Sequence, residues 1–376
     1  MNSSNFIGLN DIETIQVDHN STCNLRCPQC ARIVNGEINK CLPIKTLPLD
    51  FYDRVFTRQM FESVQRVFFC GNYGDVAASE NILEVCRLLK SRGLKTISIT
   101  TNGSLREASW WAECAKILAG PTDKVLFSID GLEDTNHLYR VGSRFSQIMS
   151  NAQAFIDAGG NARWEYLVFA HNEHQVEEAQ SMAKKMGFKS FKIKKTNRFI
   201  QDKEYKSGRA AEKSEVFNKK LNNTYTLSQP ALDKNQPLAL TNFKNIIQDH
   251  GSWNNYINST PISCKAQKEK TVFIDFNGDL WPCTWLAAPR YFSGDENLQK
   301  QQILKLLQIF GESFNNLNSH TFEEILNHPW FAKELTQSWS SRMEDSLPKM
   351  MTCGRTCGQS YEFSSNAPEN KVIVQF

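Results

Sequence analysis

The chain has 376 residues, of which 40% are hydrophobic, 22% charged and 11% aromatic, the composition of a globular protein of more than one domain. Its formal net charge of +3 is close to balance, which indicates neither a basic nucleic-acid surface nor an acidic tail. Residues 1–16 lack the pattern of a signal peptide, and no apolar stretch approaches the length of a membrane span. We therefore expect a cytoplasmic protein.

The chain contains eleven cysteines, an odd number in a long sequence. A secreted disulfide framework is typical of short chains with an even count, so we expect reduced thiols that are free to bind metal. Three of them lie within residues 23–30. Four more lie in the C-terminal third, namely Cys264, Cys283, Cys353 and Cys357.

Short β-rich runs alternate with helical stretches over residues 1–200. The expected strands are Glu13–Asp18, Arg66–Cys70, Thr96–Thr100, Lys124–Asp130, Arg163–Ala170 and Ser190–Lys195. Amphipathic segments such as Ile82–Ser91 and Gln175–Met186 lie between them, and Gly187 is the expected C-cap of the second. Such repeats predict parallel strands with right-handed crossovers, an α/β fold of the open or closed β/α barrel type. Its chemistry is expected on the loops that follow the strands.

The composition changes over residues 201–262, where Asn, Lys, Gln and Ser dominate and apolar periodicity is poor. We interpret this stretch as a polar linker or insertion with one helix near Leu240–Asp249. The predicted organisation is therefore a barrel over residues 1–200, this linker, and a smaller α+β unit over residues 263–376.

Two local signals describe the smaller unit. A hairpin of Thr271–Asp275 and Leu280–Trp285 is expected to turn at Asn277-Gly278, a pair typical of a type I′ turn. A helix is expected to begin at the capping box of Thr321 and Glu324 and to run toward Leu335.

The segment Cys23-Asn-Leu-Arg-Cys27-Pro-Gln-Cys30 directly follows the first expected strand. Three thiolates on one short loop can bind three irons of a cubane [4Fe–4S] cluster and leave the fourth iron without a protein ligand. A three-cysteine zinc site with a fourth ligand elsewhere is the alternative, because soft sulfur also suits zinc. The spacing C-x3-C-x2-C after the first strand of a β/α series favours the cluster.

With these features the chain resembles the radical S-adenosylmethionine (SAM) superfamily, and the resemblance covers nearly the whole chain. It implies a partial (β/α)6 barrel in which SAM chelates the open iron of the cluster. It also implies that an electron from the cluster cleaves SAM to methionine and a 5′-deoxyadenosyl radical, which abstracts a substrate hydrogen. One position departs from the family, since Gln29 stands where an aromatic residue often supports the adenine.

Further segments resemble the SAM-binding loops of the family. Cys70-Gly-Asn-Tyr-Gly-Asp75 resembles its Gly-Gly-Glu loop, and the strings Thr100-Thr-Asn-Gly103 and Ser128-Ile-Asp-Gly131 end the next two strands. Arg140 resembles an arginine that pairs with the SAM carboxylate, with a solvated surface position as the alternative. Turn chemistry alone is the alternative for the Asn-Gly and Asp-Gly pairs. The implied SAM-binding residues are Gly71, Gly74, Asp75, Thr101, Asn102, Ser128, Asp130 and Arg140.

Polar residues on other strands leave their roles open. Lys192 and Lys194 alternate on the sixth expected strand and so share a face, from which they reach SAM, an anionic substrate or solvent. Glu165 on the fifth strand is a comparable candidate for a polar contact. Cys70 lies beside the SAM loop, where a thiol can return a hydrogen atom to a substrate radical. A free cysteine more often packs as a small hydrophobe, so we expect oxidation or bond formation instead.

The C-terminal cysteines resemble the auxiliary-cluster extension called SPASM, or its shorter form, twitch. A full SPASM domain carries seven cysteines for two clusters, whereas this region has four. The resemblance therefore implies one auxiliary [4Fe–4S] cluster on Cys264, Cys283, Cys353 and Cys357, with a structural zinc site as the alternative. Four thiolates saturate a cubane, which favours an electron-transfer or structural role.

The resemblance implies radical chemistry but leaves the catalytic residues and the substrate open. The first hypothesis is modification of a peptide or protein side chain, because many SPASM and twitch enzymes mature ribosomal peptides. The second is dehydrogenation or another C–H modification of a small metabolite, sugar or nucleoside. A non-enzymatic iron–sulfur carrier leaves the SAM-like loops unexplained. The expected partner is an electron donor such as flavodoxin or ferredoxin, with no nucleic acid or membrane involved.

Overall fold

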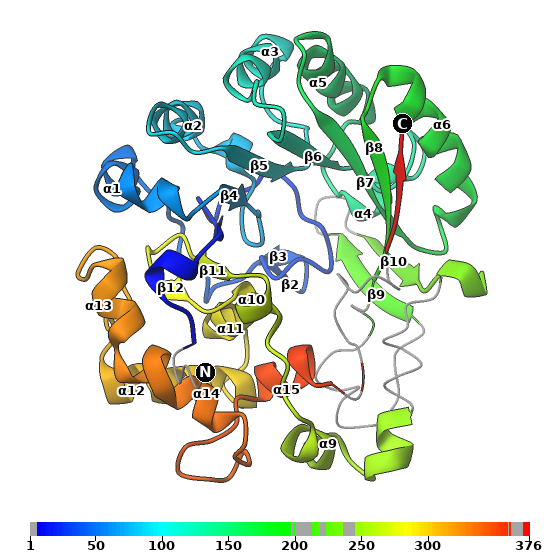
Figure 1. Ribbon diagram of the computed structural model, residues 1–376. Coiled ribbons are helices and arrows are strands. Elements are labelled where there is room, and N and C mark those ends of the chain that lie inside the picture. The colour runs from blue at the N-terminus through cyan, green and yellow to red at the C-terminus, as the bar shows by residue number, and fades with distance from the viewer. Residues whose placement is uncertain are drawn as a thin grey trace.

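A computed structural model describes residues 6–196, 199, 213–218, 223–235, 245–359, 361 and 371–376. Its largest element is a nine-stranded sheet with the strand order β12-β11-β1-β4-β5-β6-β7-β8-β13 (Figure 1). From β11 to β8 in this order the strands run parallel to their neighbours, and antiparallel β12 and β13 lie at the two edges.

The strands expected in the first half of the chain are all present, which confirms the α/β barrel-type fold. They are β1 (Thr14–Val17), β4 (Arg66–Phe69), β5 (Thr96–Thr101), β6 (Lys124–Ser128), β7 (Ala162–Val168) and β8 (Ser190–Lys195). Two very short strands, β2 (Ile33–Val34) and β3 (Glu37–Ile38), form a separate hairpin after the first cysteine segment. The C-terminal strand β13 (Lys371–Gln375) pairs with β8.

Helices connect the parallel strands and form an arc outside them (Figure 1). They are α1 (Leu49–Val55), α2 (Ile82–Ser91), α3 (Ala108–Ile117), α5 (Phe145–Asp157) and α6 (Val176–Met186), while the short α4 (Asn136–Tyr139) lies outside this arc, near the β9–β10 region. Single 3-10 turns occur in this half at Leu9–Asp11, Gln59–Glu62, Val76–Ala78 and Glu173–Gln175. The C-cap predicted at Gly187 is confirmed by its left-handed φ of 91°.

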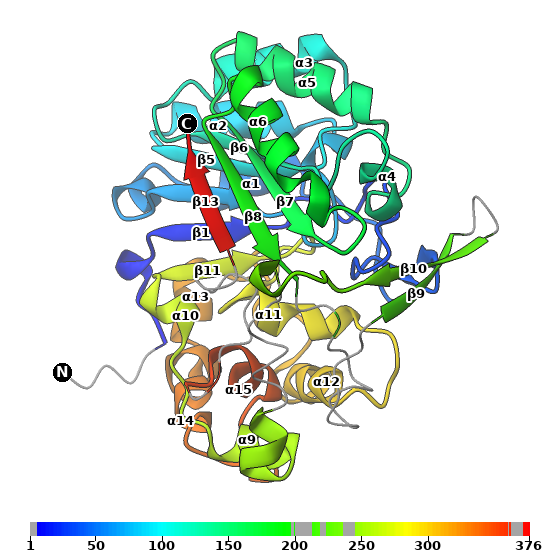
Figure 2. The same cartoon turned by 90° about the vertical axis from the view of Figure 1, so that its right-hand side faces the viewer.

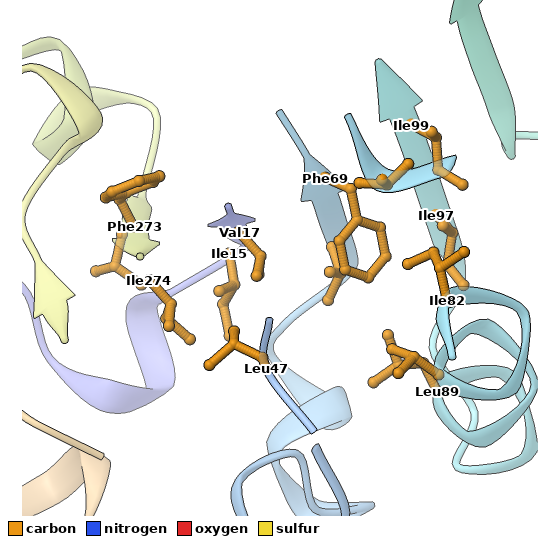
Figure 3. Close-up of a cluster of buried hydrophobic side chains, with 14 of the residues drawn as sticks. Ile15, Val17, Leu47, Phe69, Ile82, Leu89, Ile97, Ile99, Phe273 and Ile274 are labelled. Atoms are coloured by element: carbon orange, nitrogen blue, oxygen red, sulfur yellow. The ribbon is translucent and has the colours of Figure 1, made fainter. Parts of the chain in front are cut away.

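The two faces of the sheet differ in polarity because successive side chains of each strand point to opposite faces. One face packs against the helices, and its side chains, such as Phe69, Ile97 and Ile99, are buried with Ile82 of α2 (Figure 3). The opposite face, which we call the barrel interior, carries more polar residues such as Ser98. The helix-facing core therefore stabilises the sheet and leaves the interior for chemistry.

The predicted hairpin of the C-terminal part extends the sheet of the barrel. It consists of β11 (Thr271–Ile274) and β12 (Leu280–Trp281), and β11 pairs with β1 in parallel from Thr271↔Thr14 onward. The type I′ prediction is wrong, since of Asn277 and Gly278 only the glycine has positive φ, at 84°. Gly278 N–H donates to the Asp275 carbonyl at 2.9 Å, so the loop is a three-residue turn with the glycine in the left-handed position.

The remaining C-terminal elements are mainly short helices below the sheet in Figure 2. They are α9 (Trp253–Ser259), α10 (Lys265–Lys268), α11 (Thr284–Ala287), a 3-10 turn at Ala288–Tyr291, α12 (Leu298–Phe310), α13 (Phe322–Asn327), a π-helical turn at Trp330–Glu334, α14 (Leu335–Ser338) and α15 (Met351–Cys357). The capping box of Thr321 and Glu324 is confirmed. The helix it opens ends at Asn327 rather than near Leu335, because the following proline forces His328 out of helical geometry, to ψ 138°.

The polar stretch over residues 201–262 contains a hairpin that its composition did not predict. Its strands are β9 (Lys213–Asn218) and β10 (Asn223–Ser228), followed by a 3-10 turn at Asp233–Asn235. Of the helix expected near Leu240–Asp249, residues 245–250 are helical, and the earlier part lies outside the described residues. Among the described helices, none is both long and apolar enough to cross a membrane.

Candidate active site

The first cysteine loop is fixed by contacts from its own flanks. Arg32 donates from Nε to the Ser21 carbonyl at 3.0 Å and from Nη1 to the Leu25 carbonyl at 3.2 Å, which closes the loop on itself. Cys27 is buried, and the Cys30 N–H donates to its carbonyl at 3.0 Å. The loop therefore has a defined shape before any ligand is considered.

A hydrophobic cluster surrounds the three thiols. Cys27 packs with side chains of the α4 region, the end of β7 and the β9–β10 hairpin, and Cys23 and Cys30 lie against the same group. The hairpin is anchored by Tyr225, whose hydroxyl donates to the Leu138 carbonyl at 2.6 Å. Figure 2 shows this hairpin beyond the C-terminal ends of β7 and β8. The unpredicted hairpin thus forms part of the cover of the cysteine loop.

Donors from the barrel point at two of the sulfurs. Asn102 Nδ2 lies 3.6 Å from Cys23 Sγ, and Arg140 Nη1 lies 3.9 Å from Cys27 Sγ. Burial raises the pKa of Cys23 to about 12 and that of Cys27 to about 11, so both are protonated thiols in the absence of metal. A metal that binds them must displace these protons.

The donor set of this loop fits an iron–sulfur cubane with three protein thiolates. In the described part of the chain, no three His, Cys, Asp or Glu side chains are closed around a single metal-ion position. A cubane places its irons at separate corners and therefore does not require three sulfurs around one point. The thiols of Cys23, Cys27 and Cys30 instead share one loop and one hydrophobic enclosure.

Three residues of the implied SAM site meet at the ends of β4 and β5. The Asp75 carboxylate accepts from the Asn102 N–H at 2.7 Å, from the Thr101 hydroxyl at 3.0 Å, and from the Ala77 N–H at 3.0 Å. Burial raises the pKa of Asp75, while these hydrogen bonds oppose the shift. Because Asn102 also reaches Cys23, Asp75 positions the polar strand ends against the cysteine loop.

The two glycines of the β4 loop allow close backbone packing, and Gly74 packs against the segment before Cys23. A Cβ on Gly74 would lie 2.2 Å from the Asn20 carbonyl oxygen, and Gly71 has a positive φ of 65°. The Asp75 N–H donates to the Thr22 carbonyl at 2.8 Å across the same contact. Both glycines therefore have an internal packing role, whatever ligand they also approach.

Gly74→Ala is expected to lower the free energy of unfolding by about 1–3 kcal/mol, because the methyl group would overlap backbone that cannot move freely. Urea unfolding of the anaerobically reconstituted chain measures this. Gly8→Ala is the matched control, since its added Cβ would meet only the flexible carboxylate of Asp11, at 2.8 Å. Equal unfolding midpoints for the two variants would contradict the tight contact between Gly74 and Asn20.

Asp130 and Arg140 form a buried ion pair with an N–O distance of 2.6 Å. The second carboxylate oxygen of Asp130 accepts from the Leu167 N–H at 2.7 Å, so β6, β7 and the segment after α4 are joined at one point. Arg140 is therefore not a solvated surface residue, and it connects Asp130 to the Cys27 sulfur. Ser128 is buried on the same face of β6 as Asp130, two residues before it.

Glu165 lies between the two lysines of β8. Its carboxylate is 3.3 Å from Lys192 Nζ and 3.2 Å from Lys194 Nζ. Burial alone would raise the pKa of Glu165, but the two ammonium groups lower it to about 2. The three polar candidates of β7 and β8 thus form one ion-pair cluster in the barrel interior, and their pairing replaces the solvent-facing alternative.

Cys70 belongs to a polar network that sequence reasoning missed. Its thiol donates to Asp18 Oδ1 at 3.3 Å, and Asn72 donates to the same oxygen from its N–H at 2.8 Å. The Asn72 side chain also donates to the Thr284 hydroxyl at 2.8 Å, next to Cys283. Burial raises the pKa of Asp18 to about 6, against the effect of these hydrogen bonds. The available signal was an acidic residue at the end of an apolar strand.

The four C-terminal cysteines are brought together from separate elements. Cys264 precedes α10, Cys283 precedes α11, and Cys353 and Cys357 lie one turn apart on α15. All four line one small apolar cavity, together with aromatic residues such as Trp339. Cys264 and Cys357 are hydrogen-bonded to each other, and burial raises the pKa of Cys283 to about 12. Four thiols in one enclosure fit a second cluster, and as at the first loop, no three of them are closed around a single metal-ion position.

Comparison with known proteins adds a family match. The model of the Radical SAM superfamily matches residues 17–186, which reach from the end of β1 to the end of α6. No curated protein sequence matches the chain.

Among solved structures the chain is similar to SuiB of Streptococcus suis bound to S-adenosylmethionine, with 19% identity over 73% of this chain and a TM-score of 0.45. It spans about 60% of that SuiB chain. It is also similar to anSMEcpe with bound AdoMet, with 17% identity, coverage of 90% of this chain and 93% of that one, and a TM-score of 0.43. It is similar as well to BtrN in complex with AdoMet and 2-DOIA, with 12% identity, coverage of 96% of this chain and 98% of that one, and a TM-score of 0.44.

Proposed function

We propose that the chain, whose residues 17–186 match the model of the Radical SAM superfamily, is an enzyme that modifies a peptide or protein side chain by hydrogen abstraction. When bound, the cluster and SAM supply the 5′-deoxyadenosyl radical of this family. The residues of the chain hold and orient these groups and keep water away from them.

The observation that carries the proposal is the contact between the cysteine loop and the polar strand ends. Asn102 reaches Cys23 from the end of β5, and Arg140 reaches Cys27 while paired with Asp130 at the end of β6. We propose that Cys23, Cys27 and Cys30 hold the SAM-binding [4Fe–4S] cluster. The proposed SAM cradle consists of Gly71, Gly74, Asp75, Thr101, Asn102, Ser128, Asp130 and Arg140.

A polar hollow beside the turn that follows β11 favours a peptide as the substrate. It has a volume of about 520 Å³ and is lined by the segment Cys41–Lys45, by the turn at Asn277 and by residues of and after α12. Ser21, two residues before the first cysteine, holds this segment by donating from its hydroxyl to the Pro43 carbonyl at 2.6 Å. An open, hydrogen-bonding surface of this kind suits an extended peptide better than a small, enclosed metabolite.

The second cysteine set completes the proposal. We infer that Cys264, Cys283, Cys353 and Cys357 hold one auxiliary [4Fe–4S] cluster within residues 263–376, where it exchanges electrons or supports the fold. Reduction of the first cluster requires an external donor, for which a flavodoxin or ferredoxin is suited. Reduced thiols and such a donor are consistent with a cytoplasmic location.

Incubation of a cell extract with the reconstituted enzyme, SAM and dithionite tests the proposal. We expect mass spectrometry to find a mass change on a peptide or protein, together with 5′-deoxyadenosine. The Asp130→Asn variant serves as a control that keeps the shape of the side chain and removes its charge. A mass change confined to a small metabolite would overturn the peptide assignment and favour the metabolite alternative.

A further inference from the structure

Three cations gather at the N-terminal end of the barrel interior, away from the cysteine loop and the SAM cradle. Arg66 begins β4, Lys124 begins β6, and Arg163 lies near the start of β7. The residues that follow them, such as Val67 and Val125, are buried in the helix-facing core, so the three cations share the interior face. All three side chains are partly exposed, which leaves them accessible to a small solute.

This group, which we call the basal cation cluster, lacks a counter-charge of its own. Within the described chain, no acidic group lies within ion-pair distance of Arg66, Lys124 or Arg163. Burial lowers the pKa of Arg66, which the exposed Glu269 partly offsets and Arg163 lowers further. Burial also lowers the pKa of Lys124, and the other two cations add to the effect. The three positive charges therefore repel one another.

One interior acid and one strand-end acid of the neighbouring strands are already paired with other cations. Glu165 lies two residues after Arg163 on β7, nearer the C-terminal end of the strand, and it pairs with both Lys192 and Lys194. Asp123, which precedes β6, pairs with Lys90 of α2 with an N–O distance of 2.6 Å. Among the described residues, the three cations thus have only the exposed Glu269 acting on them, and it lies beyond ion-pair distance.

Two donors within the cluster are also unsatisfied. The buried Arg66 Nε has no hydrogen-bond partner, and neither has the hydroxyl of Ser98. Ser98 lies on β5, between the strands of Arg66 and Lys124, and is the register partner of Lys124. Arg163 uses its Nε on the Ser190 hydroxyl at 2.9 Å, which leaves its terminal nitrogens free to bind an anion. Buried donors without partners are costly, so both groups favour a solute that offers hydrogen-bond acceptors at this place.

We propose that the basal cation cluster binds a phosphate-type oxyanion. A tetrahedral dianion offers several acceptor oxygens to guanidinium, ammonium and hydroxyl donors at once, and its charge offsets most of the three positive charges. The site lies at the opposite end of the strands from the cysteine loop, since Arg66 and Cys70 are four residues apart and about 13 Å distant along an extended strand. It is independent of the proposed SAM chemistry, and the occupant is inorganic phosphate or the phosphate group of a monoester.

The test is calorimetric titration of the full-length, reconstituted protein with inorganic phosphate and, separately, with glycerol 3-phosphate, at constant ionic strength. We expect saturable binding to the wild type. We also expect an affinity at least about tenfold lower for Lys124→Met, with a smaller loss for Lys124→Arg, which keeps the charge. Lys116→Met, on an exposed position of α3, is the matched control and should bind like the wild type.

A thermal denaturation series separates binding from folding effects. Without phosphate, Lys124→Met should melt at or above the wild-type temperature, because it relieves repulsion. With phosphate, only the wild type, Lys124→Arg and Lys116→Met should gain stability. Tighter binding of the monoester than of phosphate would identify a phosphorylated metabolite, and the reverse would identify free phosphate. The proposal is overturned if neither anion binds, or if Lys124→Met binds like the wild type. If the wild type does not cleave SAM, that result contradicts the proposed function and leaves the proposed anion site unaffected.

Discussion

Replacement of Cys23, Cys27 and Cys30 together by alanine is expected to abolish formation of 5′-deoxyadenosine from SAM and to remove about half of the bound iron. The wild type should bind about eight irons, as two cubanes. The loop that carries these cysteines is held by Arg32 through hydrogen bonds that involve no thiol. The variant should therefore keep its fold and lose only the cluster.

The measurements are iron per protein after anaerobic reconstitution, and chromatography of SAM cleavage products after addition of dithionite. Cys41→Ala is the matched control, because Cys41 is an exposed thiol outside both cysteine sets. It should retain full iron content and full SAM cleavage. Reductive cleavage of SAM by the triple variant at the wild-type rate would refute the assignment of the first cluster.

The parallel strands could be predicted because their burial alternates in a simple way. Val67 and Phe69 are buried on the helix-facing side while Arg66 and Phe68 face the interior, and such a pattern is visible in the sequence. The polar strand ends followed from the same alternation, since Ser128 and Asp130 share the interior side. What the sequence could not supply was the partner of each group, because pairing across strands depends on their order in the sheet.

The network around Cys70 illustrates this limit. Asp18 and Thr284 are far apart in the chain, and they approach each other only because β11 pairs with β1 beside β4. A sequence with no visible link between the C-terminal hairpin and the barrel gives no sign of that contact. The basal cation cluster was missed for the same reason, since Arg66, Lys124 and Arg163 are separate in sequence and meet through strand order.

The predictions of the end of the helix after Thr321 and of the turn type at Asn277-Gly278 were wrong for a different reason. In both cases the sequence contained a local signal for the observed structure, and another local signal was given more weight. Pro329 follows the helix that begins after Thr321, and the residue before a proline avoids helical geometry. The Asn277-Gly278 pair was assigned to a two-residue turn, although the same pair also suits a longer loop with one left-handed glycine. In the β9–β10 hairpin the alternation was hidden because β9 has one buried apolar residue, Val216, next to the exposed Phe217.

Cys283→Ala is expected to remove the auxiliary cluster and leave slow SAM cleavage intact. Cys283 shares its apolar cavity with Cys264, Cys353 and Cys357, and none of these four contributes to the hydrogen bonds that hold the first cysteine loop. Loss of one thiolate opens a saturated cubane, which should then be lost on purification. Iron should fall to about half of the wild-type content.

The distinction from a zinc site lies in the metal content of protein purified without oxygen. Stoichiometric zinc bound by wild type and lost in Cys283→Ala would replace the second cluster by a structural zinc ion. Cys114→Ala, at a buried cysteine of α3 outside both sets, controls for the loss of a buried thiol.

The neighbour of Cys283, Thr284, accepts a hydrogen bond from Asn72 in the network of Asp18 and Cys70. Product formation should therefore decline more steeply than SAM cleavage in Cys283→Ala, because the variant disturbs the side of the barrel that faces this network. Equal loss of both activities would show that the two cysteine sets do not act separately.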